Sequence, residues 1–290
     1  MTAERTAGAS RSHVPRKRFG QHFLADRSVI RKILDALAPT GGDNVLEIGP
    51  GLGALTEPLL ERIPFLQVVE IDRDIVQRLR AAHEESRLRI HEGDALQFDF
   101  GIAGADLRVV GNLPYNISTP LLFRLAQWRA RIRDCHFMLQ KEVVDRMVDH
   151  PGGPDYGRLS VMLQYRFRME KLFEVPPGAF RPPPKVRSAV VRMTPLGPEA
   201  PVALDEQALG EVVTRAFTRR RKTLRNALEG YLDVPRIEAA GLDPASRPET
   251  RSGSSSRSSP ARPAGRASAC RWSGASPAST AVPRPRATPP

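Results

Sequence analysis

The chain has few of the residues that mark metal, redox or membrane proteins. Its 290 residues include two cysteines, Cys135 and Cys270, and neither stands at the spacing of a metal or redox site. No run of about 18 apolar residues occurs, so no membrane span is expected. The first fifteen residues lack the apolar middle of a secretory signal. We therefore expect a cytoplasmic protein without a bound metal.

Signatures of several common enzyme classes are also missing. The sequence has no serine-hydrolase elbow, no P-loop and no zinc motif. The net charge is +12, but residues 251–290 contain seven arginines and no lysine, aspartate or glutamate. Residues 16–250 are left with a charge of +4. The basic pI is mostly a property of the tail, so it is weak evidence for nucleic-acid binding.

Composition divides the chain into four parts. Residues 1–15 are small and polar and are expected to form a flexible arm. Residues 16–196 form the main predicted domain, in which apolar runs alternate with amphipathic helical patterns. After a proline-rich linker, a helical domain is predicted within 197–250. Residues 251–290 consist mainly of Ser, Ala, Pro, Arg and Gly and are predicted to be disordered; we hypothesise an out-of-frame origin, which resequencing the locus tests.

The alternation within 16–196 predicts an α/β fold with a mostly parallel sheet covered by helices on both faces. The last two strands are expected to form an antiparallel hairpin. Strands are predicted at 44–48, 66–71, 88–91, 107–111, 136–139, 169–175 and 188–193. Helices are predicted at 27–38, 54–63, 73–85, 119–128 and 159–165.

A glycine-rich turn follows the first of these sheet strands, in Glu47-Ile48-Gly49-Pro50-Gly51-Leu52-Gly53. Gly49, Gly51 and Gly53 allow a sharp turn and the close approach of a ligand. Glu70 ends the next strand about twenty residues later, where a carboxylate can accept both hydroxyls of a ribose. This pattern fits an NAD(P) site or an S-adenosylmethionine site.

Two acidic residues favour S-adenosylmethionine. Glu47 precedes the turn and suits a cofactor that ends in a cationic amino acid rather than a pyrophosphate. Asp94 follows the third strand and can accept a hydrogen bond from the adenine amine of the cofactor. The alternatives are that Glu70 and Asp94 are solvated loop acids and that Glu47 only braces the turn.

A second motif, Asn112-Leu113-Pro114-Tyr115, follows the strand at 107–111. The side-chain carbonyl of Asn112 and the backbone carbonyl of Leu113 can accept the two N–H groups of an exocyclic base amine. Pro114 stiffens the turn and Tyr115 offers a stacking face. The two motifs together indicate methyl transfer to a base amine, with catalysis mainly by positioning. The alternative is an ordinary Asn-Pro turn with a core tyrosine.

A target base in structured nucleic acid must be extruded or already unpaired. We expect Phe180 to supply a second stacking face, although it also suits a loop aromatic that caps the core. Two basic clusters are candidates for phosphate contacts rather than simple solvated surface. The first is Arg16-Lys17-Arg18. The second is Arg219-Arg220-Arg221-Lys222 with Arg225, predicted to lie on a helix.

These motifs together resemble the ribosomal RNA adenine dimethyltransferase family, over residues 16–250. The resemblance rests on the segments 16–24, 47–53, 112–118, 137–142, 156–160, 182–186 and 216–226. It implies a Rossmann-like class I methyltransferase sheet with a small C-terminal all-helical domain. It assigns cofactor contacts to His22, Leu24, Gly49, Glu70, Asp94 and Asn112. The chain departs from the family pattern at His22, where asparagine is frequent, and after Thr250, where the tail replaces a helical ending.

The implied activity is dimethylation of the N6 amines of two adjacent adenines near the 3′ end of 16S rRNA. The implied substrate is an immature small ribosomal subunit, and the implied role is subunit biogenesis by a monomer. Three alternatives stay open: a 23S rRNA adenine methyltransferase of the resistance type, a non-catalytic RNA-binding assembly factor, and a dehydrogenase that uses the glycine turn.

Overall fold

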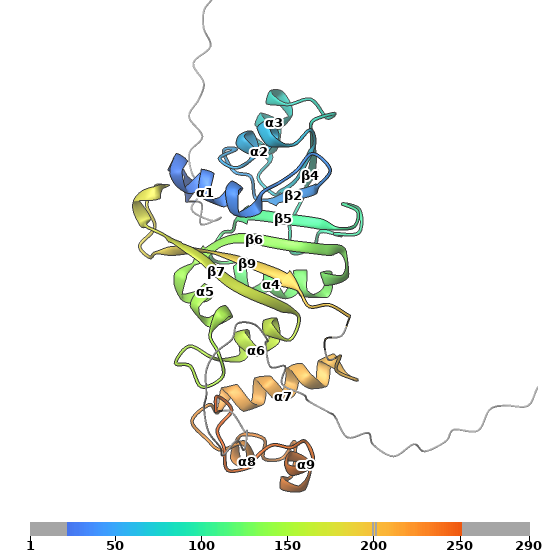
Figure 1. Ribbon diagram of the computed structural model, residues 1–290, viewed down its shortest axis with the longest axis vertical. Helices are drawn as coiled ribbons and strands as arrows, with labels where there is room; N and C mark the ends of the chain where they lie inside the picture. The colour runs from blue at the N-terminus through green and yellow to red at the C-terminus, as the bar shows by residue number, and fades with distance from the viewer. Residues whose placement is uncertain (1–21, 199, 201, 251–290) are drawn as a thin grey trace, which may run out of the picture. The chain divides into compact units, whose positions relative to one another are not determined.

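The computed structural model describes residues 22–198, 200 and 202–250, which fold as two compact units (Figure 1). The first unit extends to Val148 and also includes Arg166–Gly197. The second comprises Asp149–Tyr165 and the described residues from Pro198 to Thr250. This grouping differs from a single boundary at residue 196, because the chain leaves the first unit before the last two sheet strands and then returns. The predicted arm at 1–15 and tail at 251–290 lie outside the described residues.

A seven-stranded sheet forms the centre of the first unit. Its five neighbouring strands β4 to β6 run parallel, β9 is antiparallel to β6, and β7 is antiparallel to β9. The predicted parallel sheet with an antiparallel end is therefore confirmed. In spatial order the strands are β4 (Leu88–Glu92), β3 (Leu66–Glu70), β2 (Asn44–Ile48), β5 (Leu107–Asn112), β6 (Ile132–Gln140), β9 (Ser188–Pro195) and β7 (Phe167–Val175).

Helices connect these strands, and a short strand pair adds to the same unit. The strands β1 (Phe23–Leu24) and β8 (Phe180–Arg181) pair antiparallel, with Phe23 opposite Arg181. The helices of this unit are α1 (Arg27–Leu37), α2 (Thr56–Arg62), α3 (Arg73–Ala82), α4 (Ser118–Gln127) and α5 (Lys141–Val148), with 3-10 turns η2 (Arg129–Arg131) and η3 (Pro177–Ala179). Of the elements named here, α5, β1, β8 and the two 3-10 turns were not predicted from the pattern.

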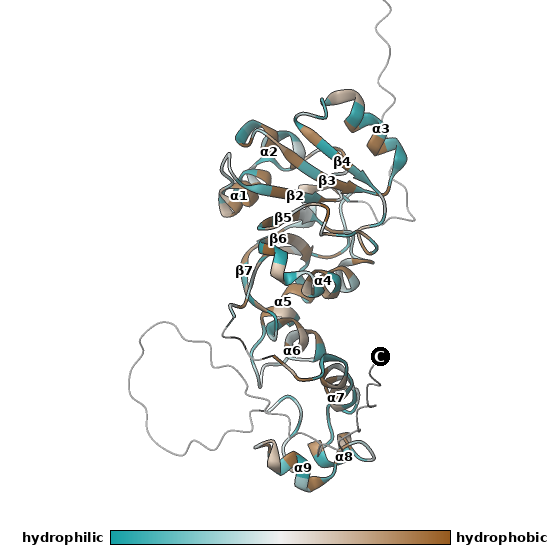
Figure 2. Cartoon of the chain, turned by 90° about the vertical axis from the view of Figure 1, so that its right-hand side faces the viewer, coloured by the Kyte–Doolittle hydropathy of each residue, from teal (hydrophilic) through white to brown (hydrophobic). Residues whose placement is uncertain are grey.

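The central strands β2, β3 and β5 are buried on both faces, which explains why they are largely apolar runs. Val45, Val110 and Met138 belong to one hydrophobic cluster with α1, α2 and α3. Their chain neighbours Leu46, Val109 and Phe137 are equally buried and point to the opposite face, because side chains alternate along a strand. The hydropathy colouring shows β3 and β5 mainly as hydrophobic (Figure 2).

The parallel arrangement gathers the polar strand ends along one edge. β2 ends at Ile48 before the glycine turn, β3 ends at Glu70, β4 is followed by Asp94, and β5 ends at Asn112. Open α/β sheets bind ligands at this carboxyl edge.

The second unit is helical in its described part. Its helices are α6 (Arg158–Gln164), α7 (Glu206–Thr218), α8 (Leu224–Ala227) and α9 (Val234–Ala239). A small core forms around four buried side chains, Ala216, Leu224, Leu228 and Ile237. Among the described helices of both units, none has the length and apolar character to span a membrane.

Candidate functional site

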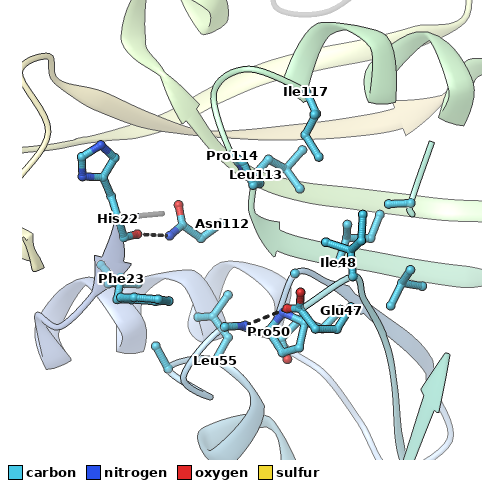
Figure 3. Close-up of a pocket in the computed structure, with 18 of the residues that line it drawn as sticks. His22, Phe23, Glu47, Ile48, Pro50, Leu55, Asn112, Leu113, Pro114 and Ile117 are labelled. Carbon is cyan, nitrogen blue, oxygen red and sulfur yellow. Dashed lines mark hydrogen bonds between the residues drawn. The ribbon is translucent and has the colours of Figure 1, made fainter. Parts of the chain in front are cut away.

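A cavity of about 290 Å³ opens at the carboxyl edge of the sheet. It is lined by His22 and β1, by residues at and after the ends of β2, β3 and β5, and by the segment after β4. Figure 3 labels lining residues from the N-terminal segment, from the glycine turn and from the motif at the end of β5. The cavity brings together most residues expected from the sequence: His22, Leu24, Glu47, Gly49, Gly51, Glu70, Asp94, Asn112, Leu113, Pro114 and Tyr115. Gly53 lies in the turn but does not line this cavity.

The backbone of the turn requires its glycines. Gly49, Gly51 and Gly53 have φ values of 68°, 55° and 88°, a region that residues with a Cβ rarely adopt. A Cβ on Gly51 would also lie 3.2 Å from the ring of Phe23. The turn is therefore packed against β1, so substituting Gly51 would disturb both the turn and the wall beside it.

Glu47 is almost fully buried at the base of the turn, with 1% of its surface exposed. Its carboxylate accepts a hydrogen bond from the Thr56 hydroxyl, with an O–O distance of 2.7 Å. Burial raises the pKa of Glu47 to about 8, and the nearby Glu70 and Glu57 charges act in the same direction. This bond supports the turn-bracing interpretation, while the side chain still lines the cavity.

Glu70 links the end of β3 to the glycine turn. One carboxylate oxygen accepts the Asp72 amide at 2.8 Å, and the other accepts the Gly51 amide at 3.4 Å. Burial raises the pKa of Glu70. Asp94 lies at the cavity wall, and its carboxylate accepts the Leu96 amide at 2.9 Å. Neither residue is a fully solvated loop acid.

The orientation of the Asn112 side chain is fixed by His22, the residue that precedes β1. Its amide nitrogen donates to the backbone carbonyl of His22 at 2.9 Å (Figure 3). The side-chain oxygen of Asn112 is thus the end left for a ligand in the cavity. The backbone amide of Leu113 donates to the Met138 carbonyl at 3.2 Å, which ties the motif to β6.

Gly111 precedes this motif and was not singled out from the sequence. A Cβ at this position would lie 2.5 Å from the backbone oxygen of Ile48. The absence of a side chain therefore allows β5 to approach the end of β2. This contact draws the two motifs together, and the glycine in the apolar run at 107–111 was the available signal.

The Tyr115 ring stands beside the His22 ring, with 5.8 Å between ring centroids and a tilt of 31°. Its hydroxyl shares a hydrogen bond of 2.7 Å with the Ser188 hydroxyl. Burial raises the pKa of Tyr115, so the phenol stays neutral and able to donate. Ser188 is fully buried in β9. Sequence reasoning missed it because it is 73 residues from Tyr115 along the chain.

The structure does not bring Phe180 into the cavity. Its side chain is fully buried in the hydrophobic cluster of the first unit, together with Val175 and Ala179. The strand β8 turns this ring inward while Arg181 is exposed. Phe180 is therefore a core residue, as the alternative interpretation expected, and in this structure its ring is not available to stack on a base in the cavity.

The second basic cluster does not lie on one helix, contrary to the prediction. α7 ends at Thr218, residues 219–222 form a turn, and α8 begins at Leu224. Both Arg220 and Arg219 bond within the second unit: Arg220 pairs with Glu249 at 3.1 Å and donates to the Pro154 carbonyl, and Arg219 donates to the Asn226 carbonyl. Arg221, Lys222 and Arg225 are exposed. Arg16, Lys17 and Arg18 lie outside the described residues.

Sequence comparisons find relatives that are named as ribosomal RNA methyltransferases. Residues 12–248 match the family described as ribosomal RNA adenine dimethylase. A protein of Aromatoleum aromaticum named ribosomal RNA small subunit methyltransferase A is 64% identical over 237 residues, which cover 82% of this chain and 89% of the relative. A protein of the same name from Chromobacterium violaceum is 60% identical and is covered to 91%.

Solved structures give the same fold. A dimethyladenosine transferase from Plasmodium falciparum superposes with a TM-score of 0.64 at 29% identity, covering 76% of this chain and 79% of that one. The 23S rRNA methyltransferase ErmE superposes with a TM-score of 0.62 at 26% identity, covering 79% and 95%. The expected Rossmann-like sheet is confirmed by these similarities together with the strand order.

Proposed function

The chain belongs to the ribosomal RNA adenine dimethylase family, and on this premise we propose that it dimethylates the N6 amines of two adjacent adenines near the 3′ end of 16S rRNA. S-adenosylmethionine is the proposed methyl donor, and an immature small subunit in the cytoplasm is the proposed substrate. One observation carries the proposal: the carboxylates suited to the donor and the Asn112 amide suited to the acceptor line a single cavity.

The charge of this cavity favours S-adenosylmethionine over a dinucleotide. Glu47, Glu70 and Asp94 line it, and within the described part of the chain no lysine or arginine does. Three acidic side chains without a cation disfavour a pyrophosphate. They suit a ligand with a sulfonium and an ammonium group, because these charges favour the ionised form of Glu47, whose pKa is raised to about 8 in the free protein. In this proposal Glu70 accepts hydrogen bonds from the ribose hydroxyls and Asp94 accepts one from the adenine amine. These features argue against the dehydrogenase alternative.

The residues of the chain act on the acceptor amine by positioning. The amine of adenine is a poor nucleophile because its lone pair is delocalised into the ring. The Asn112 side-chain oxygen and the Leu113 carbonyl accept its N–H bonds and favour a pyramidal nitrogen, while Tyr115 stacks on the base. The donor, when bound, supplies a methyl group on a sulfonium sulfur that departs as a neutral thioether. The new N–C bond leaves the nitrogen positively charged, and it then loses a proton to solvent, so no strong base is required in this scheme.

The small-subunit assignment has support over the two remaining alternatives. The relatives named as small-subunit methyltransferases are 54–64% identical, whereas the 23S rRNA enzyme ErmE is 26% identical. A non-catalytic assembly factor has no need for Asn112 with its amide fixed by His22, or for Glu70 at the turn. The exposed Arg221, Lys222 and Arg225 are proposed to contact rRNA phosphates.

The test is transfer of labelled methyl groups to small subunits that lack the modification. After incubation with the protein, the rRNA is digested and the labelled nucleosides are mapped by mass spectrometry. We expect N6,N6-dimethyladenosine at two adjacent positions near the 3′ end of 16S rRNA. Label in 23S rRNA only, or no label in either RNA, would contradict the proposed function.

A further inference from the structure

A second cavity, of about 490 Å³, adjoins the first within the same unit. Phe23, Leu24, Leu52 and Ala54 line both cavities, so β1 and the glycine turn form the wall between them. The other residues that line it are Ala25, Arg27, Ile30, Gly53, Arg181 and Pro182. The sequence expectations assign Gly53 to the cofactor turn and give no role to the two arginines.

The two neighbouring cavities differ in the ionisable side chains that line them, which are acidic in the first and basic in the second. The first is lined by Glu47, Glu70 and Asp94. The second has two arginines, and no aspartate or glutamate among the described residues lines it. The cationic methyl donor and the phosphates of the RNA acceptor can thus bind in separate, adjoining cavities. Methyl transfer between them requires this proximity.

Both arginines have guanidinium groups available to an anion. Arg27 is the first residue of α1 and Arg181 lies in β8, opposite Phe23, and both are exposed. Arg181 donates from Nη1 to the backbone oxygens of Gly178 and Phe180, which hold its head in place. Within the described chain no carboxylate is within ion-pair distance of either arginine.

Asp26 is the nearest acid to Arg27 in the sequence, and it is committed to the helix. Its carboxylate accepts the backbone amide of Ser28 at 2.8 Å, the Ser28 hydroxyl at 2.7 Å and the Val29 amide at 3.2 Å. Hydrogen bonds to Ser28 and Val29 lower the pKa of Asp26. The acid caps α1 and leaves the Arg27 head group to the cavity.

The apolar part of the lining suits a base or sugar beside these cations. Phe23, Ile30, Leu52 and Pro182 provide it. Pro182 is joined to the rim of the first cavity, because its carbonyl lies 2.9 Å from Nδ1 of His22, beside Tyr115. An RNA strand whose target base occupies the first cavity can therefore reach the second cavity by a short path across this rim.

We propose that the second cavity binds the nucleotide that adjoins the target adenine, with its phosphate held by Arg27 and Arg181. The proposal rests on the proposed function. An extruded base brings its flanking phosphates with it, and their charge must be met close to the site. The acidic first cavity cannot do so, whereas the two arginines across β1 can.

The experiment measures binding of a single-stranded RNA octamer with one central adenine, by fluorescence anisotropy. Arg27→Ala and Arg181→Ala are compared with Arg31→Ala, an exposed cation one turn further along α1 that does not line the cavity. We expect each cavity variant to weaken binding about tenfold and to lower the salt slope by about one, and the control to change affinity less than twofold.

A neutral methylphosphonate in place of the phosphate next to the adenine identifies the contact. It should weaken binding to the unaltered protein and to Arg31→Ala, but have little further effect on the double variant Arg27→Ala/Arg181→Ala, in which both proposed phosphate contacts are gone. Equal losses in all proteins would overturn the proposal, and so would octamer affinities of the cavity variants that match the control. A weaker affinity of either cavity variant for S-adenosylmethionine would also overturn it, because the arginine would then bind the carboxylate of the donor.

Failure of this inference is distinguishable from failure of the proposed function. The octamer assay measures binding and gives its answer whether or not methyl transfer occurs. If the arginine variants bind the octamer normally and the protein methylates small subunits normally, the nucleotide-binding role of the second cavity is refuted and the proposed function is not. If the unaltered protein transfers no methyl group to small subunits, the proposed function is refuted.

Discussion

The amide nitrogen of Asn112 donates to the backbone carbonyl of His22 across a distance of 2.9 Å. This bond joins the end of β5 to the residue that precedes β1, 90 residues earlier in the chain. Because the nitrogen is engaged, the side-chain oxygen of Asn112 is the group directed to a ligand. The segment at 22–24 thus orients an acceptor group as well as forming the wall of the cavity.

We expect Asn112→Ala to lower the rate constant of methyl transfer by about a hundredfold, since it removes an acceptor aimed at the amine. The affinity for S-adenosylmethionine, measured by calorimetry, should stay within about threefold because Glu70 and Asp94 are untouched. Near-normal turnover would contradict the role given to this side chain.

The hydroxyl pair of Tyr115 and Ser188 should hold the stacking ring at the proper angle. Tyr115→Phe and Ser188→Ala are each expected to reduce kcat about tenfold, and the double variant should be no worse than either. Ser160→Ala is the control, since Ser160 is equally buried but lies in the second unit. Additive losses in the double variant, or an equal loss of kcat in the control, would show that the Tyr115–Ser188 hydrogen bond does not orient the ring for catalysis.

Glu47 makes the stability of the fold depend on pH. Its pKa is raised from 4.5 to about 8 in the folded protein, so the native state holds a proton that the unfolded chain releases between these values. The stabilisation present below pH 4.5 is lost as the pH rises to 8. Glu47→Gln stays neutral, so its free energy of unfolding should fall less steeply, by on the order of 4 kcal/mol, across this range. Identical slopes in urea denaturation from pH 5 to 8 would refute this.

Neutralising Arg221, Lys222 and Arg225 should weaken binding to small subunits and flatten its salt dependence, because each phosphate contact releases counterions. The matched control neutralises Arg73, Arg78 and Arg80, three exposed cations of α3. Filter binding between 50 and 200 mM salt measures both slopes. If the two triple variants share one slope, Arg221, Lys222 and Arg225 do not contact phosphates and are ordinary surface residues.

Deleting residues 251–290 should leave the affinity for S-adenosylmethionine unchanged. Every residue that lines the first cavity lies between His22 and Ile117, far from the tail in the sequence. Calorimetry on the shortened protein measures the affinity directly. A loss of binding would mean that the tail serves the cofactor site.

Much of the first unit follows from local pattern. Buried parallel strands are continuous apolar runs, and the glycine turn and the Asn112 motif stand directly after two of them, so the strands and most cavity residues were predictable. The positions that were missed depend on distant pairing. Ser188 meets Tyr115 only because β9 lies beside β6, and Phe180 is buried only because β8 pairs with β1.

The turn at 219–222 shows a different limit. A run of four cations after an amphipathic helix has good helix propensity, and nothing local requires the helix to end at Thr218. The chain turns there because Leu224 and Leu228 are drawn into the small core with Ala216 and Ile237. Tertiary packing overrides propensity at this point.

The most direct measurement is a crystal structure of the protein with S-adenosylhomocysteine and a short adenine-containing RNA. We expect the sulfur and the N6 amine of one adenine to meet in the cavity between Glu70 and Asn112, with the amine bonded to the Asn112 side-chain oxygen. An adenine bound elsewhere, with its amine out of reach of the sulfur, would contradict the assignment of this cavity to methyl transfer.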